Sequence, residues 1–193
     1  MEVFARHIVQ QWENKGYISA EEVDWCLYGL LNRLTTLFTA LSAFILGSIV
    51  LNWQNTMTFL LCVLALRKYS NGYHAKHYLN CFALTLMIVF VSLSLVNHLN
   101  HIIATILFSI SSMIIFEFAP TNSSSLHLST QEMKAMRGKV RVRLAVLSGI
   151  MILFLFFDLH KAYCIVLAIT VVAILLLPSA IAVYFNKQGE KVL

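Results

Sequence analysis

Charged side chains are scarce in this chain. Asp, Glu, Lys and Arg make up 12% of its 193 residues, whereas about 25% is usual for a soluble domain. Proline is scarce too, with two residues, and 59% of the chain is hydrophobic. This composition excludes an ordinary soluble domain and predicts an all-α, polytopic integral membrane protein.

Paired cysteines are also lacking. The four cysteines stand at positions 26, 62, 81 and 164, mostly in or beside apolar segments, so neither a disulfide framework nor a CxxC metal site is expected. We expect no cleavable signal peptide, because a long polar and charged leader precedes the first apolar segment. The sequence shows no internal repeat and no second, soluble domain.

The apolar segments predict about six transmembrane helices, since roughly 20 apolar residues cross a bilayer. They span Leu34–Leu51, Thr56–Leu66, Phe82–Val96, Ile102–Phe116, Leu144–Phe157 and Ala162–Phe185. Thr56–Leu66 is short, and must extend to Trp53 and past Arg67 to cross. We expect one membrane domain over 1–193: a cytoplasmic leader (1–33), a membrane region (34–185) and a cytoplasmic tail (186–193).

The positive charges predict the orientation. Thirteen of the fourteen Lys and Arg residues fall in the leader, the second and fourth connections and the tail. Such alternation is typical of six crossings with both termini in the cytoplasm. The net charge of +5 is therefore explained by membrane topology, and we expect the lipid bilayer, not nucleic acid, as a partner.

The leader is expected to be helical in two pieces. Four apolar residues recur at helical spacing and predict an amphipathic helix on the inner membrane surface: Val3, Phe4, Ile8 and Trp12. A break follows at Lys15-Gly16. Ser19 and Glu22 then form the pattern of a capping box, so a second helix should begin near Ala20 and could continue into the first crossing. The leader either anchors and packs, or grips a substrate.

The fourth connection combines a loop with a basic stretch. Pro120 to Ser125 is typical of a loop, and Thr130 to Arg143 predicts a basic helix. Its cations either hold the chain against anionic lipid headgroups or bind an acidic partner. Lys134, Arg137 and Lys139 are the substrate-binding candidates in this stretch.

The segment NGYHAKHYLNC (71–81) has the composition of a catalytic site. A thiol becomes a nucleophile as the thiolate, which nearby cations favour, and Arg67, Lys68 and Lys76 are close in sequence to Cys81. A histidine could take the thiol proton and return it to a leaving amine. In one straight helix His77 would be the neighbour of Cys81, whereas His74 reaches Cys81 only if the chain bends.

Three other interpretations remain open at this point. His74, His77 and Cys81 form HxxHxxxC, which could bind zinc in a membrane peptidase, although the spacing is not that of the zincin helix. The chain could instead be a small non-enzymatic transporter or peptide exporter, whose polar residues would line a path at the midplane. The segment could also be a plain polar boundary at the membrane surface.

The segment RKYSNGYHAKHYLNC resembles the central motif of the accessory gene regulator B family, the bacterial membrane peptidases that process precursors of quorum-sensing peptides. The similarity lies in Arg67, Gly72, His74 and Cys81 at the family's spacing, and in Ala119-Pro120, the basic stretch that follows and the overall length. The resemblance implies that Cys81 is the nucleophile and His74 its base, with Arg67 and Gly72 in support. It does not nominate His77.

The resemblance also implies the reaction. The precursor would carry an amphipathic leader and a charged C-terminal tail; the enzyme would cleave off the tail through an acyl-thioester and promote closure of a thiolactone or lactone ring. It implies a homodimer in the bacterial cell membrane, with no cofactor and no metal. The residues add one candidate orienting group, Glu117 near the end of the fourth crossing, because an ionisable group within a membrane segment is costly and often functional.

Overall fold

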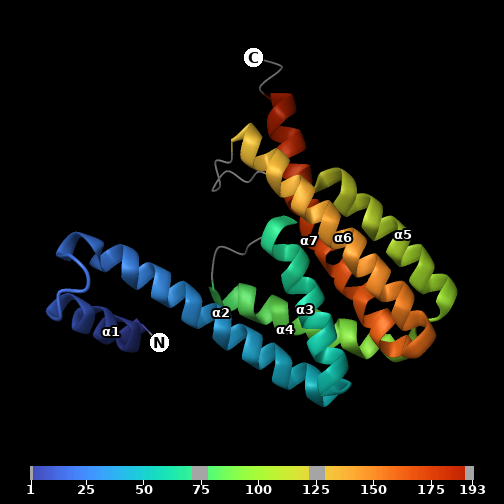
Figure 1. The fold of residues 1–193 in the computed structure, drawn as a ribbon, viewed down its shortest axis with the longest axis horizontal. Coiled ribbons are helices and arrows are strands. Elements are labelled where there is room, and N and C mark those ends of the chain that lie inside the picture. Colours follow the sequence, from blue (N-terminus) through green and yellow to red (C-terminus); the bar gives the residue numbers. More distant parts are fainter. Residues whose placement is uncertain (1, 71–77, 122–128, 190–193) are drawn as a thin grey trace. The chain divides into compact units, whose positions relative to one another are not determined.

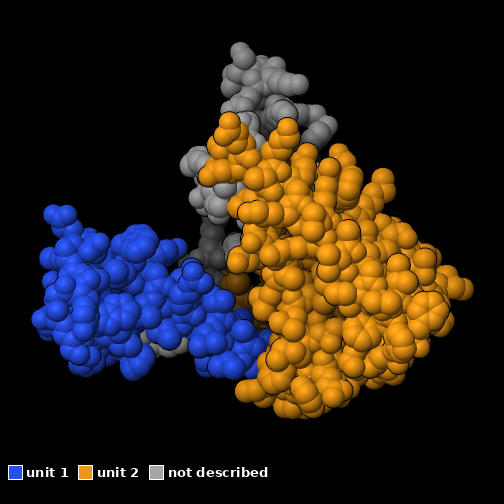
Figure 2. Space-filling view, in the orientation of Figure 1, with its two compact units in different colours: residues 1–43 blue, residues 44–193 orange. Residues whose placement is uncertain are grey.

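The computed structural model of the chain describes residues 2–70, 78–121 and 129–189, the side chains of residues 78, 130 and 182–189 excepted. The described residues form helices and no strand, which confirms the all-α prediction (Figure 1). The chain divides into two compact units, unit 1 at residues 1–43 and unit 2 at residues 44–193 (Figure 2). Helix α2 (Val23–Val50) contributes to both.

Unit 1 pairs helix α1 (Glu2–Asn14) with the first part of α2. The predicted break is present, since Gly16 adopts a left-handed φ of 72°, where glycine pays no steric penalty. The amide of Tyr17 donates to the Trp12 carbonyl and that of Gly16 to the Glu13 carbonyl, both at 2.9 Å. These two bonds form a Schellman cap, which ends α1 and reverses the chain.

The predicted capping box at Ser19 is confirmed. The Ser19 amide donates to the Glu22 carboxylate at 2.9 Å, a short 3₁₀ turn covers Ala20–Glu22, and α2 continues through the first predicted crossing. Ala5 and Val9 of α1 are buried against Leu27 of α2, whereas Val3 and Phe4, which belong to the apolar set predicted to face the membrane surface, are exposed.

Unit 2 is built around helix α7 (Leu159–Gly189). This helix packs on α3 (Trp53–Ser70), α5 (His101–Phe118) and α6 (Thr130–Phe157), and to a smaller extent on α4 (Tyr78–Leu95), which ends in a 3₁₀ turn over Val96–His98 (Figure 1). Every residue from Ala162 to Ile169 is buried, so α7 faces protein on all sides there. The hydroxyl of Ser111 on α5 donates to that of Thr170 on α7 at 3.2 Å.

The short apolar segment Thr56–Leu66 is extended at both ends in the structure, as a membrane crossing requires. Helix α3 has 18 residues and buries one face: Asn55, Thr56, Phe59, Cys62, Leu66 and Ser70. These positions follow helical spacing, so the polar residues of this face lie against protein. The predicted basic helix is also present, but it is continuous with the fifth crossing in the single helix α6.

Five helices among the described residues are long and apolar enough to cross a membrane: Ala20–Val50, Leu79–His98, His101–Phe118, Gln131–Phe157 and Leu159–Ile181. Length and composition thus support five of the six expected crossings. Helix α3 is not in this set, and its crossing stays a prediction. The chain is a multi-pass helical membrane protein.

Candidate functional site

Cys81 lies in the first turn of α4 as the structure describes it. Its side chain is half-buried, between exposed residues 79 and 80 and the half-buried Phe82. The carbonyl of Cys81 accepts a hydrogen bond from the Thr85 hydroxyl at 2.8 Å. The backbone of the nucleophile candidate is therefore held in regular helix, with its thiol partly open to a substrate.

Arg67 is a described residue that the fold brings into electrostatic range of Cys81. It stands in the last turn of α3, and its guanidinium lies close enough to the Cys81 thiol for an electrostatic interaction between the two groups. Arg67 is half-buried. Two of the four residues that carry the family pattern, 14 positions apart in the sequence, thus lie together in space.

The remaining residues of the predicted dyad are outside the described part of the chain. His74 and Gly72 are among residues 71–77, as is His77, on which both the straight-helix and zinc interpretations depend. Among the described residues no three His, Cys, Asp or Glu side chains gather as metal ligands; that observation leaves HxxHxxxC untested. Which histidine serves Cys81 stays a prediction.

The end of α3 is joined to the surrounding helices. The Thr121 amide donates to the Ser70 carbonyl at 3.2 Å, directly after the cis peptide bond between Ala119 and Pro120, and residues 119–121 are buried. From α6, Arg143 donates to the Ala65 carbonyl at 2.6 Å and lies over the Tyr69 ring, 4.1 Å from its centroid. Sequence analysis missed these contacts.

The basic stretch approaches the same helix end. The ammonium of Lys139 lies 5.5 Å, and that of Lys68 5.6 Å, from the centroid of the Tyr69 ring. Lys134 and Arg137 are exposed on the first turns of α6. Lys139 is therefore a predicted substrate-binding residue that the structure brings to the α3 end. Glu117 is exposed in the last turn of α5.

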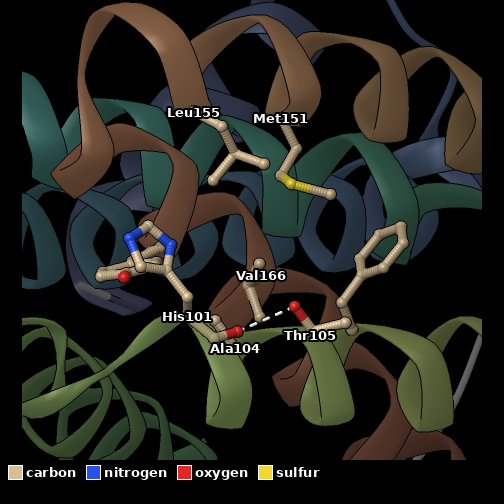
Figure 3. Close-up of a pocket in the computed structure, with 8 residues that line it drawn as sticks. His101, Ala104, Thr105, Met151, Leu155 and Val166 are labelled. Carbon is tan, nitrogen blue, oxygen red and sulfur yellow. Dashed lines mark hydrogen bonds between the residues drawn. The ribbon is translucent and has the colours of Figure 1, made fainter.

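A cavity of about 220 Å³ lies between the start of α5, the end of α6 and the start of α7. Met151 and Leu155 face His101 and Thr105 across it (Figure 3), and the His101 ring meets that of Tyr163 edge on, with 6.0 Å between centroids. Its eight lining residues include neither a cysteine nor a carboxylate. It therefore lacks a nucleophile of the kind that Cys81 provides.

The chain matches a known family over most of its length. The family model described as Accessory gene regulator B matches residues 2–176, a range that includes Arg67, Cys81 and the whole of α6. No curated protein and no solved structure matches it.

Proposed function

Because the chain belongs to the accessory gene regulator B family, we propose that it is a cysteine endopeptidase that cyclises a quorum-sensing peptide. Membership makes it a membrane protein involved in processing an autoinducing peptide. The observation that carries the finer chemistry is that the Arg67 guanidinium lies within electrostatic range of the half-buried Cys81 thiol. A fixed positive charge there stabilises the negative charge of an attacking sulfur.

The first half-reaction is peptide cleavage. The Cys81 thiolate attacks the carbonyl carbon of the peptide bond that precedes the charged tail of the precursor. The tetrahedral intermediate collapses, the C–N bond breaks, and His74, protonated after it took the thiol proton, gives that proton to the departing amine. The tail leaves, and the rest of the precursor stays on Cys81 as a thioester.

The second half-reaction closes the ring. An internal thiol of the precursor gives its proton to His74, which is neutral again after the first half-reaction, and attacks the thioester carbonyl; the bond from the carbonyl carbon to the Cys81 sulfur breaks and Cys81 departs as the thiolate. Because one thioester is exchanged for another, the free energy of this step is close to zero, whereas hydrolysis of the thioester is strongly favourable. The site must hold the internal thiol at high effective concentration and keep water away. An internal serine would give a lactone by the same route.

The setting of this reaction follows from the charge pattern and the family. We expect the protein in the bacterial cell membrane with both termini and Cys81 on the cytoplasmic side. The partner is a precursor peptide with an amphipathic leader and a charged tail, which Lys134, Arg137 and Lys139 could attract. The active form is expected to be a homodimer.

Co-expression with the precursor tests the proposal. The substrate to co-express is a peptide from any short reading frame beside the gene that encodes an amphipathic sequence with a central Cys or Ser, and cleavage is read as a size shift on a gel. Cys81→Ala and His74→Ala should abolish cleavage, while His77→Ala retains it.

Cys26→Ala is the matched control, since Cys26 is a half-buried thiol of unit 1, and this variant should cleave like the parent. Cleavage by Cys81→Ala would overturn the thiol mechanism. Loss of activity in His77→Ala with activity in His74→Ala would reassign the base.

A further inference from the structure

A single arginine of α6 joins two successive turns of α3. Arg143 is half-buried. Its Nη1 donates to the Ala65 carbonyl at 2.6 Å, and its guanidinium carbon lies 4.1 Å from the centroid of the Tyr69 ring. Ala65 and Tyr69 are four residues apart, and so share one face of the helix. The Arg143 side chain thereby holds the last two turns of α3 at one position along the helix axis and at one rotation about it.

Arg67 projects from the other side of the same turns. Two residues along an α-helix correspond to a rotation of about 200°, so Arg67 points away from the face that carries Ala65 and Tyr69. Its guanidinium interacts with the Cys81 thiol. Arg143 thus contacts the face of α3 opposite to the one from which Arg67 projects, and its route to Cys81 is through the position of the helix that carries Arg67.

The chemistry of this contact requires an arginine. A planar guanidinium can lie on an aromatic ring and donate from its edge at the same time, whereas a lysine ammonium is a compact point charge without that geometry. The lysines near Tyr69 illustrate the difference, because Lys68 and Lys139 stand 5.6 and 5.5 Å from the ring centroid.

We propose that Arg143 is a positioning residue for the peptidase: it fixes the end of α3 so that Arg67 stays beside Cys81. The inference rests on the proposed function. Other contacts hold the same helix end, namely the Thr121 amide on the Ser70 carbonyl and buried Leu66 in the α3 face. Loss of Arg143 therefore leaves α3 folded but free to rotate or slide by a fraction of a turn.

The test is a double-mutant cycle between Arg143 and Arg67, measured as the kcat and KM of precursor cleavage. Arg143→Ala should lower kcat on the order of tenfold and leave KM within about twofold. The reason is that the displaced guanidinium of Arg67 acts on the reacting sulfur and not on peptide binding. In an Arg67→Ala background, Arg143→Ala should cause no further loss. Arg143→Lys should restore little of the rate.

Arg141→Ala is the matched control. Arg141 is also on α6, lies 3.9 Å from the centroid of the Phe116 ring and donates to the Phe116 carbonyl at 3.5 Å, but its partner helix is α5. This variant should cleave within about twofold of the parent. Equal losses from Arg143→Ala with and without Arg67 would overturn the proposal, as would a raised KM with unchanged kcat.

A second measurement needs no precursor. The rate at which iodoacetamide alkylates Cys81 in the purified, detergent-solubilised chain should fall in Arg143→Lys. In a chain that already carries Arg67→Ala, Arg143→Lys should lower that rate no further. If Cys81→Ala still cleaves the precursor, the proposed function is wrong, yet this coupling between Arg143 and Arg67 can still be observed. If Cys81→Ala is inactive and the two arginines act independently, only the positioning role is wrong.

Discussion

At the scale of single residues, the cysteines of unit 2 differ in access. Cys62 is 6% exposed and Cys164 fully buried, whereas Cys81 is half-buried. Alkylation depends on access as well as on the thiolate. The fold therefore sorts three chemically identical groups into one partly accessible thiol and two buried ones.

We predict that iodoacetamide modifies Cys81 in the folded protein and stops precursor cleavage, while Cys62 and Cys164 react only after denaturation. Peptide mass spectrometry of the Cys26→Ala variant, which removes the other half-buried thiol, measures the three sites separately.

A chelator should leave cleavage unchanged under the cysteine mechanism. Inhibition by a chelator with recovery on adding zinc would instead favour the HxxHxxxC site.

Residue-level features were predictable where the determinant is local. The Ser19 capping box and the break at Gly16 follow from a few neighbouring residues, and both are present. The electrostatic interaction of Arg67 with Cys81 was anticipated only as closeness in sequence. The bond from Arg143 to the Ala65 carbonyl joins residues 78 positions apart, and nothing in the local pattern of either segment indicates it.

At the scale of helices, the close approach of α2, α3 and α4 depends on one glycine. A Cβ on Gly47 would lie 2.5 Å from Thr56 Cγ2 and 2.7 Å from Leu93 Cδ1. Thr56 is fully buried, and its hydroxyl donates to the Asn52 carbonyl at 2.7 Å. A methyl group therefore fits only if the Thr56 and Leu93 side chains, or the helices that carry them, shift.

Gly47→Ala should therefore destabilise the protein by roughly 1–3 kcal/mol, the usual cost of overpacking. Gly149→Ala on α6 is the matched control, since nothing lies within 4 Å of its Cβ position, and alanine there should stabilise by up to about 1 kcal/mol through helix propensity. Thermal unfolding in detergent measures both. A higher melting temperature for Gly47→Ala would show that the three helices are not packed this closely.

At the scale of the whole molecule, composition predicted the helical membrane class but not the arrangement of the helices. All the apolar segments look alike in sequence, so the sequence does not predict the central place of α7 in unit 2. In the structure, α7 is distinguished by its nearly continuous burial from Ala162 to Ala173. The extent of α3 was anticipated from the membrane thickness. Whether α3 crosses decides the side on which Cys81 lies.

Four observations favour a crossing by α3. Its 18 residues span about 27 Å at 1.5 Å each, close to the hydrocarbon thickness of about 30 Å. Its polar residues Asn55 and Thr56 are buried against protein, and Arg67 and Lys68 stand in the last turn, where long basic side chains can reach the headgroups. Omitting α3 would also place two of the basic connections on the outer side, against the charge rule.

We predict that a membrane-impermeant maleimide labels Cys81 only after cells are permeabilised, in a chain carrying Cys26→Ala. The control is Asn97→Cys in a chain that also carries Cys81→Ala, because Asn97 is exposed in the turn after α4 and belongs to the uncharged third connection. That cysteine should be labelled in intact cells. If α3 does not cross, Cys81 should be labelled in intact cells and the Asn97→Cys cysteine only after permeabilisation. A catalytic Cys81 would then meet the precursor outside the cell.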